Sequence, residues 1–171
     1  MRPRHNCWSW SKVNHRVHFS GRNQAWGTPW PLFRRIDALF GPCELDVCAV
    51  AENAKCQSFL SPEVDGLSVR WRGVCWMNPP YGRGLGDWLK KAQQETEAGH
   101  ARRVVCLIPS RTDTKWWHET VLPQARVIVY IRGRVKFHGA ANNAPFPSVV
   151  VVFGQLPEEK GSYPPFIKMS L

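Results

Sequence analysis

The Asn78-Pro79-Pro80-Tyr81 run, hereafter the NPPY motif, combines hydrogen-bond acceptors, two rigid residues and an aromatic ring at consecutive positions. The side-chain oxygen of Asn78 and the carbonyl oxygen of Pro79 could accept both N–H groups of a planar exocyclic amine. Such contacts would turn the nitrogen lone pair toward an electrophile such as a sulfonium methyl group. Tyr81 offers a flat face on which a base extruded from a duplex could stack. We therefore predict that these four residues are catalytic, and the alternative is a rigid turn fixed by the two prolines.

The elements that position this motif are predicted from the spacing of apolar residues. Residues 73–77 form an apolar run, which predicts a strand that ends directly at Asn78. Along the rest of the chain, predicted strands alternate with helices that carry one apolar face. The predicted strands span 45–50, 73–77, 103–108, 127–131 and 148–153, and the predicted helices span 31–40, 52–59, 87–99 and 112–122. Asp87 is a predicted helix cap, as is Thr112 or Asp113, and Pro123 is predicted to stop the last helix.

This alternation predicts an α/β fold with a mostly parallel sheet and helices on both faces. The segment 132–147 is rich in Gly, Asn and Pro, so the strand after it is predicted to be antiparallel. Such sheets bind ligands outside the carboxyl ends of their strands. The candidate site residues are therefore those that follow Val47, Met77, Ile108 and Ile131.

Three regions follow from this pattern. Residues 28–154 form the predicted domain, and 155–171 form a tail without an informative pattern. Residues 1–27 mix basic and tryptophan side chains without a regular period, which predicts an irregular basic arm. A floppy terminus is the alternative for the arm.

Net charge is the main compositional signal for a partner. The 171 residues include 23 Lys plus Arg and 13 Asp plus Glu, a formal charge of +10. A compact domain with this surplus attracts polyanions, and counterion release favours nucleic acid as the partner. The alternative is a surface that is merely basic.

Other sequence features concern location and metals. No apolar run is long enough to span a membrane, and the N-terminus lacks the apolar core of a secretory signal. We therefore expect a cytoplasmic protein whose six cysteines are reduced. Cys43, Cys48 and Cys56 do not have the spacing of a zinc site, so no metal is expected.

A series of short motifs occurs in a characteristic order along residues 26–153. Besides the NPPY motif followed by Gly82, it contains Thr28-Pro29 with Leu32-Phe33, Phe40-Gly41, Leu45-Asp46-Val47, Asn53-Ala54, Asp65-Gly66-Leu67, Leu107-Ile108-Pro109, residues 111–114, Gly133-Arg134 with Lys136-Phe137, and residues 144–148. In this order the motifs resemble the phage-type DNA N6-adenine methyltransferases, the short Dam-like family. The resemblance implies a Rossmann-like fold, S-adenosylmethionine as methyl donor, and the N6 amine of adenine in double-stranded DNA as acceptor.

The resemblance also implies roles for individual residues around the cofactor. Asp46, at the end of the first predicted strand, is where such enzymes place an acid near the cofactor, and an ordinary cap is the alternative. Thr28 and Asp65 are further candidates, with a turn role as the alternative for Asp65. Asn78 is expected to contact the cofactor as well as the acceptor. The chain departs from many methyltransferases because no glycine-rich turn follows Asp46.

Five cations lie near the predicted strand ends. They are predicted to form a basic rim that contacts DNA phosphates, and solvated surface charge is the alternative. These residues are Arg83, Arg111, Lys115, Arg134 and Lys136.

Two other interpretations share either the methylation chemistry or the DNA binding. The same motif occurs in enzymes that methylate RNA amines or glutamine amides of proteins, and the positive charge favours nucleic acid over protein. A non-catalytic DNA-binding module would use the basic rim alone. We expect a monomer or weak homodimer, located in the cytoplasm of a bacterial host if the chain is encoded by a phage or prophage.

Overall fold

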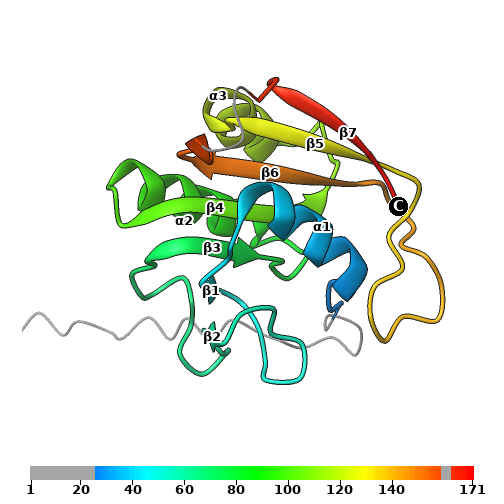
Figure 1. Cartoon of the computed structure of the whole chain (residues 1–171), viewed down its shortest axis with the longest axis horizontal. Helices are drawn as coiled ribbons and strands as arrows, with labels where there is room; N and C mark the ends of the chain where they lie inside the picture. The colour runs from blue at the N-terminus through cyan, green and yellow to red at the C-terminus, as the bar shows by residue number, and fades with distance from the viewer. Residues whose placement is uncertain (1–25, 159–162) are drawn as a thin grey trace, which may run out of the picture.

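The computed structural model describes residues 26–158 and 163–171. In this part of the chain one seven-stranded sheet has the order β2-β1-β3-β4-β6-β5-β7 (Figure 1). The strands are β1 (Leu45–Asp46), β2 (Ser58–Phe59), β3 (Gly73–Met77), β4 (Ala101–Pro109), β5 (Val127–Arg132), β6 (Ser148–Gly154) and β7 (Phe166–Ser170).

Strand direction follows the predicted pattern. β1, β2, β3 and β4 pair in parallel, and β5 pairs in parallel with β7. β6 is antiparallel to both of its neighbours, β4 and β5. This strand is the one predicted to be antiparallel after the Gly- and Asn-rich segment, and the predicted α/β fold class is confirmed.

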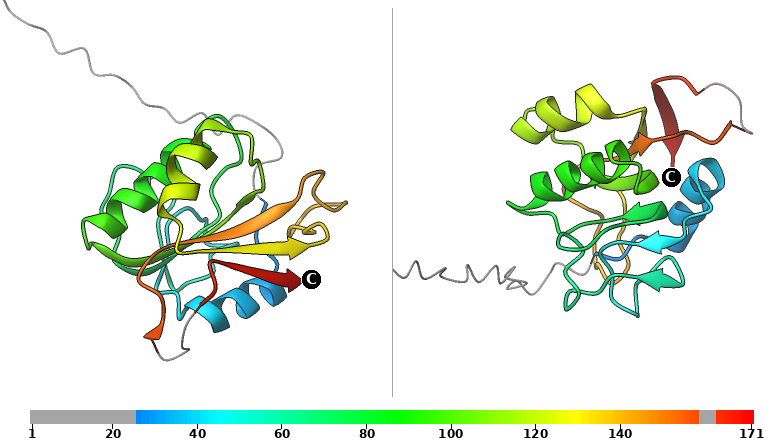
Figure 2. Two further views of the ribbon diagram at one scale, coloured as in Figure 1. Left: turned by 90° about the horizontal axis from the view of Figure 1, so that it is seen from above. Right: turned by 90° about the vertical axis from the view of Figure 1, so that its left-hand side faces the viewer.

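Helices cover both faces of the sheet (Figure 2). Helix α1 (Trp30–Phe40) buries Leu32, Phe33, Ile36 and Phe40 against one face. Helix α2 (Leu85–Glu97), the π-helical turn η1 (Trp117–Val121) and helix α3 (Leu122–Gln124) lie on the other.

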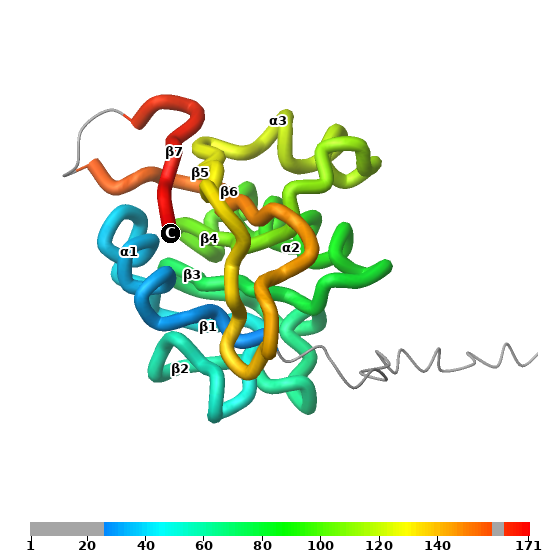
Figure 3. Tube along the Cα trace, turned by 90° about the vertical axis from the view of Figure 1, so that its right-hand side faces the viewer, coloured from blue at the N-terminus to red at the C-terminus, as the bar shows by residue number. Residues whose placement is uncertain are grey.

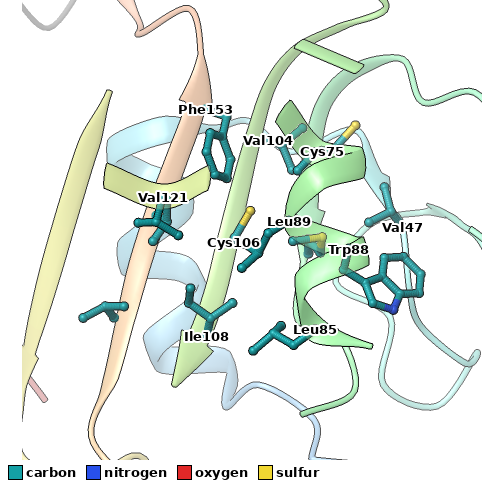
Figure 4. Close-up of a cluster of buried hydrophobic side chains, with 14 of the residues drawn as sticks. Val47, Cys75, Leu85, Trp88, Leu89, Val104, Cys106, Ile108, Val121 and Phe153 are labelled. Atoms are coloured by element: carbon teal, nitrogen blue, oxygen red, sulfur yellow. The ribbon is translucent and has the colours of Figure 1, made fainter. Parts of the chain in front are cut away.

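Burial on both faces of the sheet explains why the middle strands have continuous apolar sequences. Leu85, Trp88 and Leu89 of α2 pack onto Cys106 and Ile108 of β4 (Figure 4). Alternate residues of β4 enter the core on the α1 face, so both faces of this strand are buried. Strands buried on both faces lose the polar alternation of half-exposed strands, and their apolar runs predict them well.

The predicted helix over 52–59 is wrong. The region forms turns followed by β2, which pairs with β1. Within it, Asn53 and Ala54 N–H both donate to Val50 O, and the next N–H, of Lys55, donates to the Asp46 carboxylate instead of continuing a helical ladder. Asn53 Oδ1 also accepts from Val50 N–H, just before the region. Side-chain acceptors of this kind compete with the backbone hydrogen bonds of a helix. The predicted strand over 45–50 is also shorter, since β1 covers only Leu45–Asp46.

Three helix ends differ from the prediction. Neither Thr112 nor Asp113 caps the helical segment after β4, which begins later and has no side-chain cap at its N-terminus. Helix α2 begins at Leu85, so Asp87 lies in its first turn and is not its cap. Pro123 lies inside α3 and does not stop the helix. The chain accommodates this proline through the wider turn before it, where Leu122 N–H donates to Trp117 O, five residues back. A π-helical turn opens the spacing around a residue that has no N–H and would crowd the preceding turn.

Both ends of the described chain contain structure that no sequence pattern predicts. Residues 155–171 include β7, which extends the sheet beyond β5. Residues 1–25 of the expected basic arm lie outside the described residues. The last two residues of that arm, Trp26 and Gly27, are described and pack into the body of the protein.

Candidate active site

The NPPY motif begins directly after β3, at the carboxyl edge of the parallel strands. Figure 3 looks toward this edge, and the segment between β5 and β6 extends across it. The tip of that segment reaches the first described residues, because His138 N–H donates to Gly27 O at 2.7 Å in an isolated antiparallel bridge. The site is therefore assembled from residues that are far apart in the sequence.

Asn78 is held by hydrogen bonds at both ends of its side-chain amide. Its Nδ2 donates to the main-chain oxygen of Trp26 at 2.6 Å. Its Oδ1 accepts from the hydroxyl of Tyr81 at 2.7 Å. The same hydroxyl lies 3.1 Å from Leu107 O of β4, so one O–H group has two possible acceptors.

The ring of Tyr81 belongs to an aromatic cluster of Trp26, Tyr81, Phe137 and Phe146. The Trp26 indole stacks on Phe137 and Phe146, with ring centroids 5.2 and 5.3 Å away. Tyr81 meets these three rings edge-on, at centroid distances from 5.6 to 6.1 Å. Burial raises the pKa of the Tyr81 phenol well above its ordinary value, so the hydroxyl remains a donor.

Asp46 lies at the end of β1 and is buried. Its carboxylate accepts the backbone N–H groups of Lys55 at 3.0 Å and Cys48 at 3.4 Å, which shapes the loop after the strand. Burial raises the pKa of Asp46 to about 6, and the two N–H groups and the charge of Lys55 offset part of that effect. A protein acid with this pKa changes charge close to neutral pH.

Cys48 connects Asp46 with the NPPY motif. Burial raises the pKa of the Cys48 thiol, the Asp46 charge raises it further, and a hydrogen bond from the Asn78 backbone lowers it. Both residues are therefore close to the Cys48 sulfur. The buried Cys48 thiol behaves as a small apolar group at this position.

Asp65 adopts a left-handed backbone conformation with φ of 55°. Its Oδ1 accepts the Leu67 N–H at 3.2 Å, which closes a turn of the kind that Asp stabilises. The next residue, Gly66, approaches Val47 so closely that a Cβ on it would lie 2.2 Å from Val47 O. The turn at Asp65 thus packs beside the end of β1, and the structure shows its turn role directly.

Two buried hydroxyl oxygens in the described residues have no hydrogen-bond partner: Thr28 Oγ1 and Ser148 Oγ. Thr28 is 2% exposed and lies between the bridged residue Gly27 and helix α1. Ser148 begins β6, opposite Pro109 of β4. A buried hydroxyl without a partner is unfavourable, so each is a place where a ligand or water would gain a hydrogen bond.

The predicted DNA-binding cations are exposed and follow the carboxyl ends of three strands. Arg83 follows β3, Arg111 and Lys115 follow β4, and Arg134 and Lys136 follow β5. Lys115 Nζ lies 3.7 Å from a Glu119 carboxylate oxygen, and both side chains are largely exposed. All five cations therefore follow strand ends at the edge of the sheet where the NPPY motif lies.

The described residues lack both a metal site and a membrane-spanning helix. Residues 26–158 and 163–171 contain no group of three His, Cys, Asp or Glu side chains that could hold a metal ion. Among the same residues no helix is both long and apolar enough to cross a membrane.

Sequence reasoning missed Trp26, Phe137 and Phe146 as site residues. The sequence places Trp26 in the predicted arm. Both phenylalanines belong to motifs that carry the family resemblance, but the sequence predicts no site role for either ring. A usable signal was the presence of large apolar rings in a Gly- and Asn-rich segment at a strand end. Such rings are expected to pack against other apolar groups, and in this structure they pack against one another.

A mostly parallel sheet with an antiparallel β6 and an NPPY turn at the end of β3 defines a Rossmann-like methyltransferase fold. A family model described as DNA N-6-adenine-methyltransferase (Dam) matches residues 18–164, and the chain belongs to this family.

Two phage proteins named DNA N-6-adenine-methyltransferase are similar to the chain. The one from Haemophilus phage HP1 (strain HP1c1) is 36% identical over 115 residues, which cover 66% of this chain and 65% of the relative. The one from Escherichia phage T1 is 33% identical over 106 residues, which cover 60% of this chain and 43% of the relative. The chain thus spans less than two thirds of the length of either phage protein.

A bacterial protein matches a shorter region. The putative methyltransferase YfdM of Escherichia coli (strain K12) is 36% identical over 63 residues, which cover 33% of this chain and 69% of the relative.

Proposed function

We propose that this protein transfers a methyl group from S-adenosylmethionine to the N6 amine of adenine in double-stranded DNA. The observation that carries the proposal is the Asn78 amide, which is fixed from both ends at the carboxyl edge of β3. Membership of the Dam family and the names of the phage relatives support DNA adenine as the acceptor. The acceptor chemistry of the NPPY motif supports an amine as the reacting group.

Two features of the structure fit the methyl donor. Thr28 Oγ1 is buried without a partner, so a ligand hydrogen bond would relieve its desolvation. Asp46 uses its carboxylate for two backbone N–H groups and retains lone pairs for an ammonium or ribose hydroxyl group. Thr28, Asp46, Asp65 and Asn78 would hold the cofactor, which supplies an electrophilic methyl group on a sulfonium centre.

The residues of the NPPY motif orient the acceptor. Asn78 Oδ1 and Pro79 O accept the two N–H groups of the amine, which directs the nitrogen lone pair toward the methyl group. Tyr81 then releases Asn78 Oδ1 and keeps its contact with Leu107 O. A strong base is not required, because the methylated nitrogen carries the positive charge and loses its proton to solvent.

Base flipping brings the adenine to this amide. The adenine amine lies inside a duplex, so the nucleotide has to rotate out before Asn78 can reach it. Tyr81 supplies a ring face for the extruded base, within a cluster that also contains Phe137 and Phe146. Stacking on such rings offsets part of the cost of unstacking.

The basic rim positions the duplex over the site. Arg83, Arg111, Lys115, Arg134 and Lys136 are exposed around the carboxyl edge of the sheet and would contact phosphates. The phage origin of the relatives supports a bacterial host cell as the setting.

The test offers the protein a labelled methyl donor together with double-stranded DNA, RNA or unrelated protein in parallel reactions. We expect label in DNA alone, and no label when Asn78→Ala replaces the wild type. Label confined to RNA or to protein would contradict the proposed acceptor. Calorimetry with the donor adds a second criterion. A non-catalytic DNA-binding module would not bind the methyl donor specifically and would give no binding heat in the titration.

A further inference from the structure

The Asn78 amide has two chemically different ends, and its orientation decides what it offers to a substrate. In the structure Nδ2 faces the main-chain oxygen of Trp26, which leaves Oδ1 on the side of Tyr81. An amide rotated by half a turn would set its oxygen against the Trp26 carbonyl, so two acceptors would face each other. It would also present N–H groups to an incoming amine, where an acceptor is needed.

The Trp26 carbonyl is held in place by contacts on both sides of its peptide bond. On one side, the indole stacks on Phe137 and Phe146. On the other, Gly27 O accepts from His138 N–H at 2.7 Å. Gly27 itself is buried, and a Cβ on it would lie 3.4 Å from the Cβ atoms of Asn53 and His138. The segment between β5 and β6 thus fixes a carbonyl that precedes α1.

We propose that Trp26 is a positioning residue for methyl transfer, whose main-chain carbonyl keeps the Asn78 amide in the orientation that presents Oδ1 to the acceptor amine. This inference rests on the proposed function of Asn78. It assigns a role to a residue outside the NPPY motif, and it explains why an indole packs beside a polar motif. The aromatic packing of Trp26 determines where its carbonyl lies.

The most direct test is the nuclear magnetic resonance signal of the Asn78 side-chain amide in the free, isotope-labelled protein. The Nδ2 proton that is hydrogen-bonded to Trp26 O should resonate downfield and exchange slowly with water. The signal is assigned by its loss in Asn78→Ala. Trp26→Phe retains a stacking ring and should leave the signal in place. Trp26→Ala should shift it and speed its exchange by about tenfold or more, as expected for a lost hydrogen bond.

A matched control is available four residues along the chain. Trp30 is 47% exposed and meets the ring of Phe33 edge-on, away from the aromatic cluster. Trp30→Ala should leave the Asn78 signal unchanged. An unchanged signal in folded Trp26→Ala would overturn the proposal.

Kinetics provide the second criterion. Trp26→Ala should lower kcat by about tenfold or more with KM for the methyl donor within about threefold, and Trp26→Phe should keep both within about threefold of wild type. A purely structural role for Trp26 predicts lower thermal stability with an unchanged kcat for the fraction that is folded. That result would also overturn the proposal.

Asn78→Asp tests the same contact without altering Trp26, and so serves if Trp26→Ala does not fold. An ionised carboxylate keeps an acceptor oxygen for the amine but has a second oxygen in place of Nδ2, so it cannot donate to Trp26 O. We expect kcat to fall by about tenfold or more, whereas activity within about threefold of wild type would contradict the proposal. If wild-type protein methylates no DNA, the proposed function fails, and the amide signal still decides whether Trp26 orients Asn78.

Discussion

The Tyr81 hydroxyl donates to Asn78 Oδ1 at 2.7 Å, on the very oxygen that would accept the target amine. In the free protein, the acceptor that we propose for the substrate is therefore satisfied by a side chain of the protein itself. Leu107 O, 3.1 Å from the same hydroxyl, offers an alternative acceptor, so a substrate can take Asn78 Oδ1 without leaving the phenol unpaired.

This relationship gives opposite expectations for two substitutions of Tyr81. Tyr81→Phe should lower the free energy of unfolding by about 1 kcal/mol, because a partly buried hydrogen bond is lost. Its single-turnover rate should stay within about threefold of wild type, since the substrate supplies the donor that Asn78 then lacks. Tyr81→Ala also removes the stacking ring, which should lower the rate by about ten- to hundredfold. Equal losses in the two variants, measured by denaturant unfolding and quenched-flow kinetics, would remove stacking from the role of Tyr81.

Asn78→Ala should separate chemistry from cofactor binding. The lost acceptor matters most as the amine nitrogen changes geometry, so the single-turnover rate should fall by about a hundredfold or more. Affinity for the donor, measured by calorimetry, should fall far less than the rate, because Asn78 is only one of the four residues proposed to hold the donor. Gln124→Ala removes an exposed amide at the end of α3 and should change neither quantity. A rate for Asn78→Ala within about threefold of wild type would show that Asn78 is not the positioning group.

Donor affinity should depend on pH through Asp46. Burial raises the pKa of this carboxyl to about 6, so lowering the pH through that value protonates it and removes its charge. Because the charged form is the one that attracts an ammonium group, donor affinity should weaken by up to about tenfold per unit below about pH 6. Asp46→Asn should bind more weakly at neutral pH and lose this dependence. Wild-type affinity that is constant between about pH 5 and pH 7.5 would argue against a charged contact.

Removing the unpartnered hydroxyl of Thr28 should have opposite effects on the stability of the free protein and on its affinity for the methyl donor. Thr28→Val removes a buried polar atom at constant shape, so the free protein should be as stable as wild type or more stable by about 1 kcal/mol. Donor affinity should fall if the hydroxyl binds the cofactor. Ser148→Ala removes the other unpartnered hydroxyl, on a strand that β3 and β4 separate from β1, and should leave donor affinity unchanged. Thermal unfolding and donor titration measure both effects, and unchanged affinity in Thr28→Val would exclude Thr28 as a ligand.

The basic rim predicts a change in salt dependence. Arg134→Ala should weaken binding to duplexes of any sequence and reduce the slope of log K against log salt by about 0.9 for one lost phosphate contact. Arg126 is also exposed but precedes β5, at the opposite edge of the sheet, so Arg126→Ala serves as the control. Equal slopes for the two variants in fluorescence anisotropy titrations would place DNA elsewhere.

The predictable parts of the fold are those in which residues contact near neighbours or the core. The apolar run before Asn78 and the one-sided pattern of α1 predicted β3 and α1, since burial alone determines both. The loop over 52–59 could not be predicted, because the Asp46 carboxylate takes a backbone N–H from Lys55, nine residues away. Such a contact leaves no periodic trace in the sequence.

The same distinction applies to the candidate site. The NPPY motif is contiguous, and its residue types indicate its chemistry directly. Trp26 lies 52 residues from Asn78, and its contact is made by a main-chain oxygen that every residue type has. Residue identity therefore carries no signal for this contact.

The proposed methylation of adenine N6 in DNA through the Asn78 amide can be tested from its product. The most direct measurement digests unmodified duplex DNA after incubation with the protein and S-adenosylmethionine, and identifies the methylated nucleosides by mass spectrometry. We expect N6-methyladenine as the product with wild-type protein and none above background with Asn78→Ala. Methylcytosine as the product, or N6-methyladenine in equal amount from Asn78→Ala, would contradict the proposed function.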